Sequence, residues 1–122
     1  MIKNTSKTSE FDHFETLADE WWDPDGKFKI LHTLTPIRIS YIKKKLFDKK
    51  YSKKSLSNFN ILDLGCGGGL VCEPLARLGA NITGIDFVKQ NIITAKKHAK
   101  KLKVDIEYFH QNLHNLKLKK KI

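Results

Sequence analysis

A run of glycines in the middle of the sequence gives the clearest chemical signal. Four of the five residues from Gly65 to Gly69 are glycine, and they follow the apolar stretch Asn60–Leu64. Glycine has no Cβ, so the backbone N–H groups of such a turn can approach a ligand closely. A helix that follows the turn presents an N-terminus that favours negative charge. The stretch therefore predicts a loop that binds an anionic or strongly polar group.

An acidic residue at the end of the next apolar stretch adds a second signal. Asp86 ends the stretch Asn81–Asp86 and lies 17 residues after Gly69. A carboxylate at the end of the second strand of a nucleotide-binding unit can accept hydrogen bonds from both hydroxyls of a ribose. Together, the loop and Asp86 predict a ligand with an adenosine-like ribose and an adjacent anionic or polar group.

Two common nucleotide-binding motifs do not fit the loop. The dinucleotide fingerprint G-x-G-x-x-G needs a third glycine at position 70 or 72, where the sequence has Leu70 and Cys72. The phosphate-binding motif that ends in G-K-[ST] is absent as well. A tight strand-to-helix turn that binds no ligand remains the structural alternative.

The elements that position these residues follow from the hydrophobic pattern. Strands are predicted at 60–64, 81–86 and 105–110, with helices at about 70–78 and 88–102. Pro74 is compatible with the first of these helices only in its first turn, and Gly79 ends it. The order βαβαβ predicts an α/β fold, half of a doubly wound parallel sheet.

Helices are predicted before the sheet. Apolar residues at spacings of three and four indicate an amphipathic helix over roughly 9–22, and Pro36 is expected to open a second helix that runs to Leu46. We therefore divide the chain into an N-terminal helical segment (1–48), a Ser/Lys-rich linker (49–58), the βαβαβ cofactor-binding half-domain (59–112) and a lysine-rich tail (113–122).

Charge and composition narrow the class of protein. The net charge is +10, and residues 41–122 alone carry +12, yet 21 of the 23 basic residues are lysine. Proteins that grip phosphates usually use arginine, and no aromatic residues alternate with the lysines, so nucleic acid is not an expected partner. The apolar runs are too short to span a membrane. Cys66 and Cys72 fit neither a zinc site nor a disulfide framework, which favours a reducing, cytoplasmic location.

The spacing Gly65-x-Gly67-x-Gly69, preceded by Asp63, resembles the loop of S-adenosylmethionine-dependent methyltransferases. Longer segments of the chain resemble the ubiquinone biosynthesis O-methyltransferases, and the double tryptophan Trp21-Trp22 is more specific than the loop. The matching segments are Phe11–Glu15, Ala18–Asp23, Gly26–Lys29, Leu31-His32, Pro36–Arg38, Leu62–Leu70, Glu73–Ala80 and Thr83–Asp86.

The resemblance implies an S-adenosylmethionine cofactor and methylation of phenolic hydroxyls on polyprenylated catechol and demethylubiquinol intermediates. It implies that Arg38, Gly65 and Asp86 contact the cofactor, and we expect Gly67 and Gly69 to take part as members of the loop. Arg38 could pair with the methionine carboxylate or be a surface arginine. The catalytic base is not identified.

Other residues leave alternatives open. Trp21 and Trp22 could cover an aromatic substrate or pack in the core, with core packing favoured. His13 and His32 could accept a proton, but a lone histidine is more often a packed or solvated residue. The lysine-rich faces could hold the chain at the inner face of a membrane, near a lipid-soluble substrate.

The family also predicts what this sequence does not contain. Further strands, the substrate pocket and the acidic ligands of a divalent metal are expected beyond residue 112, so no metal ligands are assigned here. We therefore expect a truncated or split enzyme in which the first strand is an edge, completed by a separate C-terminal polypeptide. The alternative is a non-catalytic remnant that retains part of the cofactor site.

Overall fold

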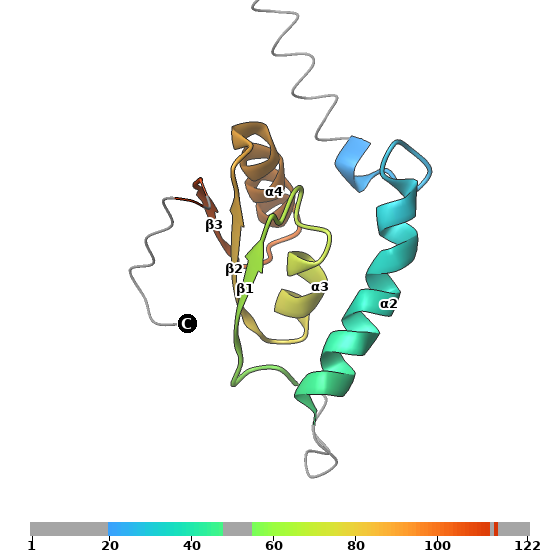
Figure 1. Cartoon of the computed structure of the whole chain (residues 1–122), viewed down its shortest axis with the longest axis vertical. Coiled ribbons are helices and arrows are strands. Elements are labelled where there is room, and N and C mark those ends of the chain that lie inside the picture. Colours follow the sequence, from blue (N-terminus) through green and yellow to red (C-terminus); the bar gives the residue numbers. More distant parts are fainter. Residues whose placement is uncertain (1–19, 48–54, 113, 115–122) are drawn as a thin grey trace, which may run out of the picture.

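The computed structural model of the chain describes residues 20–47, 55–112 and 114. Three parallel strands alternate with two helices, and a longer helix precedes them (Figure 1). The elements are α2 (Lys29–Leu46), β1 (Asn60–Leu64), α3 (Cys72–Arg77), β2 (Asn81–Asp86), α4 (Lys89–Lys101) and β3 (Glu107–His110). The predicted α/β fold and its βαβαβ order are confirmed.

The strand order is β1-β2-β3, so β2 is central and β1 lies at one edge of the described sheet. Asn60 pairs with Asn81 and Leu64 with Ile85, which places the ends of β1 and β2 level with each other. Asp86 is in register with His110 of β3. The glycine loop and Asp86 therefore follow neighbouring strands at the same, carboxyl edge of the sheet. Ligands bind at this edge in open α/β sheets.

The prediction for the second N-terminal helix was wrong at its start. Pro36 does not open this helix but lies inside α2, seven residues after its first residue Lys29. Proline removes one backbone N–H donor from the helix, so the carbonyl of His32 lacks its usual partner four residues on, yet α2 continues to Leu46. The hydroxyl of Thr35 donates to the carbonyl of Leu31 over 2.7 Å, one residue before the proline.

The core lies between the sheet and its helices, and Figure 1 shows α3 between β1 and α2. It extends into the range that the sequence assigned to the linker, because Leu56 is completely buried and its N–H donates to the carbonyl of Leu78. Apolar side chains of α2 pack against this core. They are Ile39, Ile42 and Leu46.

Two other predicted segments fall mainly outside the described residues. Residues 20–22 are helical and belong to the end of the helix predicted at 9–22, whose earlier part is not described. The same holds for most of the lysine-rich tail from residue 113 onward. Within the described ranges, no helix is long and apolar enough to cross a membrane.

Candidate functional site

The turn after β1 is built into the sheet by its own backbone. The N–H groups of Gly65 and Cys66 both donate to the carbonyl of Ile85, over 2.7 and 3.0 Å, so the loop continues the pairing of β1 with β2. Gly65, Gly67 and Gly69 have φ values of 76°, 56° and 94°. Residues with a Cβ rarely adopt these angles, which explains why the loop needs glycine at these three positions.

The three positive-φ glycines differ in what surrounds them. A Cβ built on Gly67 would lie 2.5 Å from the ring of Trp21, and one on Gly69 would overlap the hydroxyl of Tyr108. A Cβ on Gly65 would meet nothing within 4 Å. The loop is thus covered by protein at Gly67 and Gly69 and open at Gly65. The open part marks where a ligand can approach the backbone.

Asp86 joins this loop to the second strand and to α4. It is only 5% exposed. Its Oδ1 accepts from the N–H of Gly67 over 3.2 Å. Its Oδ2 accepts from the N–H of Val88 over 3.0 Å and from Nδ2 of Asn91 over 3.1 Å. A carboxylate has about four acceptor positions, so three donors leave it room for a hydroxyl.

Asp63 lies on β1 behind the loop and has an unfavourable environment for its charge. Burial raises the pKa of this carboxyl, and the negative charge of Asp86 adds to the increase. The Cys72 thiol, which donates to Oδ2 of Asp63 over 3.3 Å, and the positive charge of Arg38 lower the pKa in part. The exposed Arg38 is therefore close enough to act electrostatically on this edge of the sheet.

The structure thus brings together four of the five residues that the sequence predicted as a binding site. Gly65, Gly67 and Gly69 form one loop, and Asp86 accepts from that loop. Arg38 lies on α2, and its positive charge lowers the pKa of Asp63. Their roles in binding a cofactor stay predictions. His32 points elsewhere: its Nε2 donates to the carbonyl of Trp21 over 2.8 Å. His13 lies outside the described residues.

The two cysteines are free and buried. The hydrogen bond to Cys66 and burial raise the pKa of the Cys72 thiol, which keeps it protonated. Burial likewise raises the pKa of Tyr108, whose hydroxyl has no hydrogen-bond partner in the described part of the chain. Among the described residues, no three His, Cys, Asp or Glu side chains are grouped so that they could hold a metal ion.

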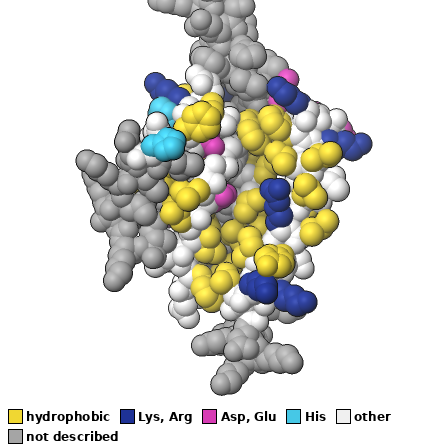
Figure 2. Space-filling model, viewed as in Figure 1, with side chains coloured by type: hydrophobic (Ala, Val, Ile, Leu, Met, Phe, Trp, Pro, Cys, Tyr) yellow, Lys and Arg dark blue, Asp and Glu magenta, His cyan; other side chains and the backbone are white. Residues whose placement is uncertain are grey.

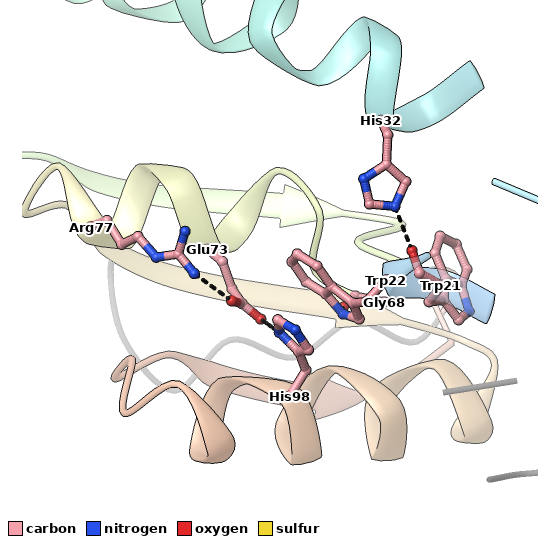
Figure 3. A network of polar contacts seen from close by, with 7 residues as sticks. All are labelled: Trp21, Trp22, His32, Gly68, Glu73, Arg77 and His98. Atoms are coloured by element: carbon pink, nitrogen blue, oxygen red, sulfur yellow. Dashed lines mark hydrogen bonds and ion pairs between the residues drawn. The ribbon is translucent and has the colours of Figure 1, made fainter. Parts of the chain in front are cut away.

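A second polar network, which no local sequence pattern predicts, adjoins the loop (Figure 3). Glu73 of α3 is completely buried, and its carboxylate contacts His98 Nδ1 at 2.6 Å and Arg77 at 3.3 Å. The ring of His98 stacks on Trp22, with centroids 3.6 Å apart and 2° between the planes. In the sequence, the only sign of this network is that Glu73 and Arg77 are four residues apart on one predicted helix, a spacing that allows an ion pair.

The comparisons with known proteins agree with this geometry. Residues 61–121 match a family model described as a methyltransferase domain. The ubiquinone biosynthesis O-methyltransferase of Pelagibacter ubique (strain HTCC1062) is 50% identical over 121 residues, which cover 97% of this chain and 50% of that protein. The protein of the same name from Bartonella tribocorum is 47% identical, over 88% of this chain and 47% of that protein.

Solved structures show the same fold at lower identity. The magnesium protoporphyrin IX methyltransferase of Synechocystis PCC 6803, solved with bound SAH, aligns with a TM-score of 0.63 and 18% identity, over 87% of this chain and 49% of that one. A Pyrococcus horikoshii OT3 protein aligns with a TM-score of 0.56 and 23% identity, over 79% and 38% of the two chains. The chain spans about half the length of the curated relatives it matches.

Proposed function

The chain belongs to the methyltransferase domain family, and on that premise we propose that it forms the cofactor-binding part of an S-adenosylmethionine-dependent O-methyltransferase of ubiquinone biosynthesis. The substrates that we propose are the phenolic hydroxyls of polyprenylated catechol and demethylubiquinol compounds. The identity of about half of all positions to relatives of that name supports this substrate class.

The observation that carries the proposal is the position of Asp86 beside a glycine loop that is open at Gly65. Asp86 ends β2, and its carboxylate retains acceptor capacity. We propose that this carboxylate accepts a hydrogen bond from a ribose hydroxyl of the cofactor. The backbone of the loop then lies against the methionine part, because Gly65 offers the approach that Gly67 and Gly69 do not.

Arg38 supplies the charge that this arrangement needs. S-adenosylmethionine carries a carboxylate on its methionine part, and when bound it supplies an electrophilic methyl group on a sulfonium centre. A guanidinium is suited to hold a carboxylate with two parallel hydrogen bonds. Arg38 is exposed on α2, and its charge already reaches Asp63 at the carboxyl edge of the sheet. We propose that it pairs with the methionine carboxylate.

Titration calorimetry with S-adenosylhomocysteine tests cofactor binding by this chain. We expect saturable binding by the wild-type protein and a loss of at least about tenfold in affinity for Asp86→Ala, since a charge-assisted hydrogen bond to the ribose disappears. Asp105→Ala is the matched control. Asp105 is an exposed aspartate that precedes β3, at the opposite edge of the sheet, and its removal should leave binding unchanged. A folded wild-type sample without any binding would favour the non-catalytic alternative.

For the transfer step itself, we propose that further strands must add beside β1. In the described sheet β1 pairs on one side with β2, and the side chain of Leu64 at its end is 51% exposed. Two further apolar side chains are exposed at the carboxyl ends of the other strands: Phe87, directly after β2, is 67% exposed, and Phe109 of β3 is 43% exposed. Figure 2 shows hydrophobic side chains gathered over much of the visible face, between scattered Lys and Arg.

Co-expression tests this completion of the site. We expect methyl transfer to a phenolic acceptor when the chain is produced together with a polypeptide that carries the remaining strands of a close relative. The chain by itself should bind S-adenosylhomocysteine without turning over substrate. Turnover by the 122-residue chain without a partner would contradict the proposal.

A further inference from the structure

The two adjacent tryptophans both reach the glycine loop, from the segment that precedes α2 (Figure 3). The indole N–H of Trp22 donates to the carbonyl oxygen of Gly68 over 3.0 Å. The ring of Trp21 lies against the backbone of the loop, so that a Cβ on Gly67 or Gly68 would come within 2.5 or 2.6 Å of it. The two tryptophans that contact the loop are therefore more than 40 positions away from it in the sequence.

The indole of Trp22 is held in place by two histidine rings and, through one of them, by a buried carboxylate. His98 of α4 stacks on its ring at 3.6 Å, and the buried carboxylate of Glu73 holds the Nδ1 of His98 at 2.6 Å. His32 of α2 approaches the same indole edge-on, with ring centroids 6.2 Å apart. Side chains of α2, α3 and α4 therefore fix the position of the Trp22 indole N–H independently of the loop.

Trp21 connects the loop to the proposed ribose acceptor. Its indole N–H donates to Oδ1 of Asn91 over 3.2 Å, and Nδ2 of Asn91 donates to Oδ2 of Asp86 over 3.1 Å. Phe28 stacks on the Trp21 ring at 3.9 Å, with 5° between the planes. An indole with Phe28 on its ring and glycine backbone against it offers little free surface for an aromatic substrate.

We propose that Trp21 and Trp22 are positioning residues that clamp the glycine loop in the conformation that receives the cofactor. The part of this inference that concerns the cofactor rests on the proposed function above. The part that concerns the loop rests on the contacts alone. The double tryptophan is then a device of the cofactor site, not a platform for the substrate.

Hydrogen exchange on Trp22→Phe tests the clamp without any ligand. The substitution keeps an aromatic ring on His98 and removes the donor to Gly68. We expect amide exchange in residues 65–70 to become about threefold to tenfold faster, since one hydrogen bond contributes about 0.5–1.5 kcal/mol. Exchange in β2 should change little. Tyr41→Phe is the matched control, because Tyr41 is 62% exposed on α2 and also loses one polar hydrogen.

Cofactor affinity and fluorescence give the second readout. Affinity for S-adenosylhomocysteine should fall by about threefold to tenfold in Trp22→Phe and stay unchanged in Tyr41→Phe. The chain has two tryptophans, so Trp22→Phe leaves Trp21 as its single indole fluorophore. Because Trp21 contacts the loop and Asn91, its emission should change when S-adenosylhomocysteine binds.

Several results would overturn the clamp. Unchanged exchange in residues 65–70 of Trp22→Phe would do so, as would an equal acceleration in β2, which would indicate general destabilisation. Unchanged affinity in that variant would remove the positioning role. If the wild-type protein does not bind S-adenosylhomocysteine, the proposed function fails, while the exchange comparison still decides the clamp. If Trp22→Phe does not fold, the NMR spectrum of the wild-type protein tests the clamp instead. Rapid exchange of the Trp22 indole N–H with solvent would contradict its hydrogen bond to Gly68.

Discussion

The backbone N–H of Gly67 donates a hydrogen bond to Oδ1 of Asp86 over 3.2 Å, which ties the turn after β1 to the end of β2. The same carboxylate accepts from the N–H of Val88 just before α4. A side chain expected to bind a ligand is therefore also a structural link between three consecutive parts of the chain. Its substitution will affect stability as well as binding.

The two roles of Asp86 can be separated by comparing two variants. Asp86→Ala leaves the donors of Gly67, Val88 and Asn91 without an acceptor, and should lower the free energy of unfolding by about 2–4 kcal/mol. Asp86→Asn retains one acceptor oxygen and should cost about half as much. Urea unfolding followed by circular dichroism measures both. Equal losses for the two variants would show that the retained acceptor is unimportant.

The buried Glu73 side chain should gain more stability from its contact with His98 than from its contact with Arg77. His98 is 20% exposed and contacts Glu73 at 2.6 Å, whereas Arg77 is 53% exposed and lies at 3.3 Å. Loss of His98 leaves a completely buried carboxylate poorly compensated, so His98→Ala should cost about 2–4 kcal/mol. Arg77→Ala should cost less than about 1 kcal/mol.

A double-mutant cycle identifies the cause of that loss. In the background Glu73→Gln, which has no carboxylate to leave unpaired, His98→Ala should cost about 1–2 kcal/mol less than in the wild type. Urea unfolding of the four proteins gives the coupling energy. A coupling near zero would assign the effect of His98 to its stacking on Trp22 instead.

Alanine substitutions at two positions of the loop should destabilise the folded protein for different reasons. Gly65 has a φ of 76° and open space around it, so Gly65→Ala should cost about 1–2 kcal/mol of backbone strain. Gly68 does not have a positive φ, but its Cβ would lie 2.6 Å from Trp21, so Gly68→Ala should cost about 1–3 kcal/mol through overpacking.

The combination with Trp21→Ala distinguishes the two causes. Removing the indole should relieve the overlap at Gly68, so that Gly68→Ala costs less in that background than alone. The cost of Gly65→Ala should stay the same in both backgrounds, because nothing lies within 4 Å of its Cβ. Thermal unfolding of the five variants (Gly65→Ala, Gly68→Ala, Trp21→Ala and the two double substitutions) and the wild type measures these differences. Equal relief at both positions would contradict the packing of Trp21 on Gly68.

The free energy of unfolding should depend on pH through the ionisation of Asp63. Burial raises its pKa in the folded state above the ordinary value of 3.8, so the folded protein binds a proton over a range of pH where the unfolded chain does not. The contribution of Asp63 to the free energy of unfolding is therefore most favourable at low pH, and falls as pH rises from about 4 through the raised pKa. Asp63→Asn should remove this component.

Arg38 provides a second test of the same group. Its positive charge lowers the pKa of Asp63 in part, so Arg38→Gln should raise that pKa further and extend the fall in stability to higher pH. Carboxyl ¹³C NMR of Asp63 measures the pKa in both proteins. An identical titration would show that Arg38 does not act on this edge of the sheet.

Much of the fold follows from local patterns. The apolar stretches that become β1 and β2 end where glycines or turn residues follow, so their bounds, Asn60–Leu64 and Asn81–Asp86, could be predicted. Gly79 ends the region of α3 with a φ of 102°, which local chemistry also dictates. The start of α2 could not be predicted. Proline is typical of the first turn of a helix, whereas α2 begins seven residues before Pro36 and continues past it.

The sequence by itself therefore determined the alternation of strands and helices, the glycine loop and the acidic residue after β2, since each depends on neighbours in the chain. Only the tertiary structure decided which groups meet around the loop. Trp22 reaches Gly68 across 46 positions, and His98 reaches Glu73 across 25. Such contacts arise because packing α3, α4 and the N-terminal segment against one sheet brings distant side chains together, and no local periodicity records that geometry.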